Sequence, residues 1–145
     1  MLALTVTLIQ CSTDPAIKPG PAGRELPPCP DSPNCVSSLS DDKSHYVKPL
    51  EYEGSVEKAK EELIAVISSM KRSKIVRAEA GYLHATFTSF LFRFVDDVEF
   101  SFDHAQKVIH VRSASRTGYS DLGVNRKRVE EIRKRFATRE IGQTD

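Results

Sequence analysis

Apolar and polar side chains alternate over most of residues 92–103, FRFVDDVEFSFD. Successive side chains of an extended chain point to opposite faces, so this pattern predicts a strand with one buried face. The buried face is expected to carry Phe92, Phe94, Val98, Phe100 and Phe102, and the other face Arg93, Asp97, Glu99 and Ser101. Such a strand requires neighbours in a sheet and a cover for its apolar face.

Residues 107–115, KVIHVRSAS, supply a partner for this strand. If the loop DHAQ separates Phe102 from Lys107, Phe100 lies opposite Ile109 and Asp96 lies opposite Ser113. The polar face then pairs Asp97 with Arg112 and Glu99 with His110. Apolar meets apolar and acid meets base in this register, and a slip of one residue destroys both matches.

The remaining elements complete an α+β domain. Strands are expected at 74–81 and 82–89, and helices at 55–72 and after Ser120 or Asp121. The first helix carries an apolar stripe of Val56, Ala59, Leu63, Ile67 and Met70, and the second one of Val129, Ile132 and Phe136. The order helix, four strands, helix predicts a four-stranded antiparallel meander with both helices on one face. The domain is expected to span 29–139, followed by a disordered tail at 140–145.

The N-terminus has the order of a bacterial lipoprotein signal. An apolar segment, residues 1–9, precedes Cys11, and a Pro/Gly-rich stretch at 12–28 is expected to be a flexible tether. Gln10 departs from the small residue usual before the cysteine, and the basic start is missing. The alternative is an N-terminus that is disordered or packs on the core, with an unmodified Cys11. Lipidation predicts a domain anchored to the cell envelope and facing the periplasm.

Cys29 and Cys35 form the other cysteine feature, CPDSPNC. Redox catalysts use C-x-x-C near a helix start, and a zinc site would need further paired ligands. In an exported chain the two cysteines are therefore expected to form a structural disulfide.

Asp96 interrupts the apolar face of the long strand, near Ser113, Ser115 and Arg116. A buried carboxylate is costly unless it is paired, so two interpretations stay open. The residues form either a satisfied polar cluster that joins the sheet to the second helix, or one end of a polar pocket.

The segment SRTGYSDLGVNR holds two glycines and a predicted helix start, with Asp121, Asn125 and Arg126 as candidate site residues. Arginines and helix N-termini attract anions, so an anion pocket is one interpretation. Tight turns and a capped helix are the other.

Composition excludes some functions. The 21 basic and 20 acidic residues nearly cancel, so net charge does not indicate a nucleic-acid partner. The stretch from Arg112 to Arg139 is basic, with nine Lys or Arg against three acidic residues, but the acids within its helix argue against nucleic acid. The four histidines lack the spacing of a metal site, so no metal or cofactor is expected.

Three motifs together resemble one family: CPDSPNCVSS, DDVEF and RSASRTGYSDLGVNRKRVEEIRKRF. The likeness to the domain of unknown function 1499 family covers Cys29 to about Phe136. It implies a small envelope or plastid-associated domain without an established activity, and it supplies no catalytic residues. The expected function is a non-catalytic module that binds an envelope partner or a small anionic ligand. The alternative is a hydrolase-like enzyme that uses Asp96, Ser113, Ser115 and Arg116.

Overall fold

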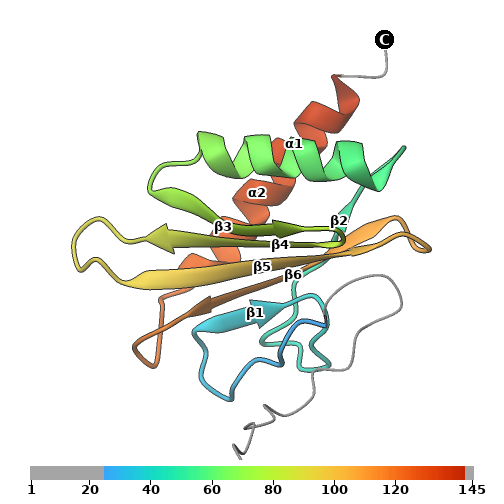
Figure 1. Ribbon diagram of the computed structural model, residues 1–145. Coiled ribbons are helices and arrows are strands. Elements are labelled where there is room, and N and C mark those ends of the chain that lie inside the picture. Colours follow the sequence, from blue (N-terminus) through green and yellow to red (C-terminus); the bar gives the residue numbers. More distant parts are fainter. Residues whose placement is uncertain (1–24, 143–145) are drawn as a thin grey trace, which may run out of the picture.

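The computed structural model describes residues 25–142 (Figure 1). Its elements, in chain order, are β1 (Cys35–Ser37), β2 (Leu50–Glu51), α1 (Val56–Ser69), β3 (Ser73–Glu79), β4 (Tyr82–Thr88), β5 (Val95–Asp103), β6 (Val108–Ser115) and α2 (Val124–Ile141). The described part is an α+β structure, as the sequence predicts. No helix in it is long and apolar enough to cross a membrane.

The strands form one six-stranded antiparallel sheet in the order β1-β6-β5-β4-β3, with β2 also paired to β6. Strands β3 to β6 are the predicted four-stranded meander. The two short strands were not predicted because each has only two or three residues, too few for a visible alternation. They bring the N-terminal part of the domain beside β6.

Both helices lie on the same side of the sheet (Figure 1). Ser55 caps α1 by accepting a hydrogen bond from the Lys58 backbone N–H. The core lies between this layer and the sheet, where Phe100, Phe102, Leu63 and Phe136 are almost completely buried. Burial of this apolar surface is the main force that holds the layers together.

The register of the β5–β6 hairpin differs from the prediction by two residues. Phe100 pairs with Val111 and Glu99 with Arg112, and Asp96 lies opposite Ser115 rather than Ser113. The turn explains the shift: the Asp103 carboxylate accepts backbone hydrogen bonds from Ala105 and Gln106, which extends the pairing to Asp103 and Val108. Because the shift is even, the side chains within β5 and β6 stay on their predicted faces.

Phe92 and Phe94 are not on the buried face, contrary to the prediction. β5 begins only at Val95, and the two rings belong to the β4–β5 loop, where they are exposed. The alternation continues into this loop although the hydrogen-bonded pairing does not.

The domain boundaries also need correction. α2 continues to Ile141, into the segment expected to be a disordered tail. Leu26, which was assigned to the tether, is buried. Cys11 and the signal-like segment lie outside the described residues.

β3 forms one edge of the sheet. Its pairing with β4 shifts between Ile75 and Arg77, which marks a bulge at the exposed Val76. Lys74 and Arg77 flank the bulge with exposed charges.

Candidate functional site

Polar side chains gather where β5 and β6 meet the start of α2. This polar cluster consists of Asn34, Asp96, Ser113, Ser115, Asp121, Asn125 and Arg128. The sequence places Asp96, Ser113, Ser115, Asp121 and Asn125 in one candidate pocket, and the structure brings these five together. Asn34 and Arg128 were missed.

Arg128 neutralises the buried carboxylate of Asp96. Its Nη2 donates to Asp96 Oδ2 at 2.6 Å, and the two side chains are only 11% and 8% exposed. Its Nη1 donates to Asn125 Oδ1 at 2.8 Å, and the guanidinium lies 4.9 Å from the centre of the Phe87 ring. A charge-assisted hydrogen bond and a cation–π contact thus compensate both buried charges.

Asn125 is the hub of the polar cluster and is completely buried. Its Oδ1 accepts from Ser113 Oγ at 2.5 Å as well as from Arg128. Its Nδ2 lies within hydrogen-bonding distance of Asn34 O, Ser115 Oγ and Asp121 Oδ2. The donors and acceptors of this amide are therefore used inside the protein.

Asp121 binds the start of α2, although the helix begins three residues later. Its carboxylate accepts backbone hydrogen bonds from Gly123 at 2.8 Å and Asn125 at 2.9 Å. Burial alone would raise the pKa of Asp121, but these bonds and the one from the Asn125 side chain together lower it. The carboxylate is thus held ionised at the helix N-terminus.

Arg116 does not belong to the polar cluster. It forms a bidentate ion pair with Asp97, at 2.8 and 2.9 Å, and His84 Nε2 lies 2.8 Å from the same carboxylate. These side chains lie on the sheet face opposite the helices, because Asp97 alternates with the buried Asp96. The hydrogen bond from Arg116 is the main cause that lowers the pKa of Asp97, and the pair raises the pKa of Arg116.

Arg126 points away from the polar cluster as well. It donates to the carbonyls of Tyr46 and Ser44, both at 2.7 Å. It therefore fixes the loop between β1 and β2 against α2.

Within the polar cluster, the geometry does not provide Ser113 with a general base. Ser113 Oγ donates to an amide oxygen and lies 3.3 Å from Arg128 Nη1. The Asp96 carboxylate is occupied by Arg128, and His84 lies on the other face of the sheet. Within residues 25–142, no three His, Cys, Asp or Glu side chains converge on a metal site.

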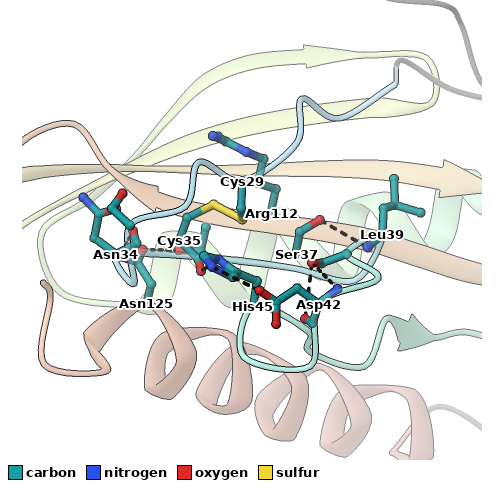
Figure 2. The surroundings of a disulfide bond; sticks show 12 residues. Cys29, Asn34, Cys35, Ser37, Leu39, Asp42, His45, Arg112 and Asn125 are labelled. Atoms are coloured by element: carbon teal, nitrogen blue, oxygen red, sulfur yellow. Dashed lines mark hydrogen bonds and ion pairs between the residues drawn. A yellow bond between two sulfur atoms is a disulfide. The ribbon is translucent and has the colours of Figure 1, made fainter. Parts of the chain in front are cut away.

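The disulfide joins Cys29 to Cys35 beside the polar cluster, with its sulfur atoms 2.08 Å apart (Figure 2). Asn34 and Asn125 lie on one side of it and His45 with Asp42 on the other. Asn34 Nδ2 donates to Gly118 O at 2.6 Å, and His45 Nδ1 is 3.0 Å from Cys35 O. The disulfide thus holds the turn that supplies Asn34 to the cluster.

Two surface hollows lie away from the predicted site residues. One, of about 800 Å³, is lined by Tyr52, Lys58, Lys107 and Glu140, among others. The other, of about 320 Å³, lies between the helices and includes Val66, Glu131 and Arg135. Neither contains a member of the polar cluster.

The fold and the site define a small α+β domain whose first strand is fixed by a disulfide and whose polar residues bind one another. The family model described as "Protein of unknown function (DUF1499)" matches residues 25–136, so the chain belongs to this family. A comparison with curated proteins found no match to the chain.

Proposed function

We propose that the chain is a non-catalytic binding domain of the cell envelope, exported and anchored to the membrane by a lipid on Cys11. The observation that carries the non-catalytic role is the closure of the polar cluster. Arg128 neutralises the carboxylate of Asp96, and the hydroxyl of Ser113 donates its hydrogen bond to Asn125 Oδ1. A catalytic site would instead direct a free nucleophile and its base towards substrate.

The arginines of the candidate anion pocket have protein partners. Arg128 binds Asp96, Arg116 binds Asp97, and Arg126 binds two backbone carbonyls. An anion would have to displace these acceptors. This favours a partner that contacts an exposed surface over a small anionic ligand in the cluster.

Export is supported by the disulfide and by the order of the N-terminal sequence. Disulfides persist in oxidising compartments such as the periplasm, and the cysteine that remains, Cys11, follows an apolar segment.

The anchor can be tested by the intact mass of the full chain recovered from bacterial membranes. We expect residues 1–10 to be absent and Cys11 to carry a diacylglyceryl group, and a Cys11→Ser variant to lose both changes. An unmodified Cys11 with residues 1–10 retained would refute anchoring.

The non-catalytic role is tested with a fluorophosphonate probe, which labels activated serines. We expect no labelling of the folded chain. Labelling that disappears in Ser113→Ala but persists in the exposed control Ser120→Ala would instead establish the hydrolase alternative.

A further inference from the structure

The β4–β5 loop, residues 89–94, presents its apolar side chains to solvent. Phe90 is 76% exposed, Leu91 74% and Phe92 68%. Large apolar side chains grouped in this way on a protein surface usually mark a site of interaction. Their position at the tip of a hairpin means that they project from the domain (Figure 1).

The loop is held in this form by its own hydrogen bonds. Ser89 N donates to Phe94 O at 2.8 Å, and Phe94 N donates to Ser89 Oγ at 2.9 Å. Arg93 turns the chain with a left-handed backbone, φ 56°, and the rings of Phe92 and Phe94 stack 5.5 Å apart. These hydrogen bonds hold the apolar tip, residues 89–94, in a defined conformation in which its side chains do not pack on the core.

A second loop with exposed apolar residues leaves the same end of the sheet. Residues 116–123, between β6 and α2, expose Tyr119 and Leu122 by 74% and 86%. The Arg116 N–H donates to Val95 O, which places the start of this loop beside the start of β5. Figure 1 shows both loops at the end of the sheet where β4 and β6 finish.

Basic residues surround the apolar tip. Arg72, in the turn before β3, donates to Thr88 O at 3.1 Å, and its guanidinium lies 5.7 Å from the centre of the Phe90 ring. Lys71, Lys74 and Arg93 are also exposed at this end. Residues 68–78 and 84–95 contain no Asp or Glu, and the carboxylate of Asp121 in the second loop binds backbone N–H groups.

We propose that this apolar end, consisting of the loops 89–94 and 116–123 with Arg72 and Arg93, inserts into the surface of an anionic phospholipid bilayer. The projecting tip would bury its aromatic rings among the acyl chains, and the arginines would contact lipid phosphates. The absence of Asp and Glu from residues 68–78 and 84–95 matches a negatively charged surface. The inference deepens the proposed function by naming its partner, and it rests on the proposed role in binding but not on the lipid anchor.

Vesicle co-sedimentation of the full-length Cys11→Ser chain tests the proposal without the lipid. One set of vesicles is phosphatidylcholine alone and the other an equimolar mixture with phosphatidylglycerol. We expect binding to the anionic vesicles that weakens as salt is added. A Phe90→Ser/Leu91→Ser/Phe92→Ser variant should bind at least about tenfold more weakly, because it removes the apolar side chains whose burial in the bilayer favours binding. Arg72→Gln/Arg93→Gln should also lose about tenfold or more, on anionic vesicles only.

Matched controls remove similar groups elsewhere. Leu39→Ser removes an exposed apolar side chain at the far end of β1, and Lys58→Gln/Lys134→Gln removes two exposed charges from the helices; both should bind as the parent does. Residues 1–10 are common to all variants, so binding through them cannot produce a difference. Equal binding by the parent and the triple variant would overturn the proposal. So would a concentration-dependent dimer in sedimentation velocity that the triple variant abolishes, because a second copy would then cover the apolar end.

These outcomes separate the two proposals. Loss of vesicle binding in the triple variant supports the bilayer contact even if the mass of the native protein shows an unmodified Cys11. A lipidated Cys11 combined with unchanged binding by the triple variant would support the lipid anchor and refute the contact of the apolar end with the bilayer.

Discussion

At the scale of single residues, Asp96 and Arg128 form an ion pair that is almost completely buried. Sequence reasoning found Asp96, because a charged residue interrupts an apolar face, but not its partner. Arg128 lies 32 residues away on another element. A signal was nevertheless present: Arg128 precedes Ile132 by four positions and follows Asn125 by three, which places it beside the buried stripe of the helix. Only its contact with Asp96 required the tertiary structure.

Asp96→Ala should strongly destabilise the domain. The substitution leaves Arg128 buried without its counter-charge, which typically costs about 3–5 kcal/mol. Urea unfolding measures the loss. Glu131→Ala breaks the exposed ion pair with Arg135 and should cost far less, because solvent screens such a pair. The double variant Asp96→Ala/Arg128→Met should recover part of the loss. A cost for Asp96→Ala no greater than that of the control would contradict the description of a buried pair.

At the scale of elements, the alternation of β5 predicted faces but not the exact partners. Side chains repeat every two residues, so a register shifted by two leaves the faces unchanged although each residue gains a new partner, such as Ser113 opposite Val98. The choice between these registers was made by Asp103, whose carboxylate closes the turn through backbone N–H groups. The short β1 was beyond sequence prediction for another reason: it is held by pairing with β6, a contact distant in sequence.

Removal of the disulfide by Cys29→Ser/Cys35→Ser should lower the free energy of unfolding by about 2 kcal/mol. The estimate is the chain entropy of a closed ring of this size, and the two prolines inside it reduce the gain because they already restrict the unfolded ring. Urea unfolding in a Cys11→Ser background measures the effect. Dithiothreitol should destabilise the parent by the same amount and leave the double variant unchanged. Equal sensitivity of both to dithiothreitol would argue against a structural disulfide.

At the scale of the whole molecule, the polar groups tie together parts of the chain that are far apart in sequence. Asp97 of β5 bridges His84 of β4 and Arg116 after β6, and Asn125 of α2 donates to the backbone carbonyl of Asn34 before β1. The helices, the meander and the α+β class could be predicted because they depend on local periodicity. The position of Arg116 and Arg126 outside the polar cluster could not be predicted. Both arginines are as close in sequence to the members of the cluster as those members are to one another.

Stability should fall on acidification. The pKa values of Asp97 and Asp121 are lowered below the ordinary value of 3.8, so their contribution is complete above that value and is lost as the pH falls below it towards the folded-state values. Urea unfolding across this range measures the slope. Asp97→Asn should flatten it, and Arg116→Gln should do the same, because the hydrogen bond from Arg116 is the main cause of the lowered pKa of Asp97. An unchanged slope in both variants would contradict this origin.

The bulge at Val76 affects how copies of the domain can associate through their sheet edges when many of them share a surface. A free strand edge is a template on which another chain can add a strand, and crowding makes such additions more frequent. The bulge breaks the regular spacing of backbone donors and acceptors along β3, and Lys74 and Arg77 place positive charges beside the break. A strand from a neighbouring copy would meet a mismatched ladder at this edge. The bulge therefore makes this edge of the sheet a poor template for the addition of a strand when copies are crowded.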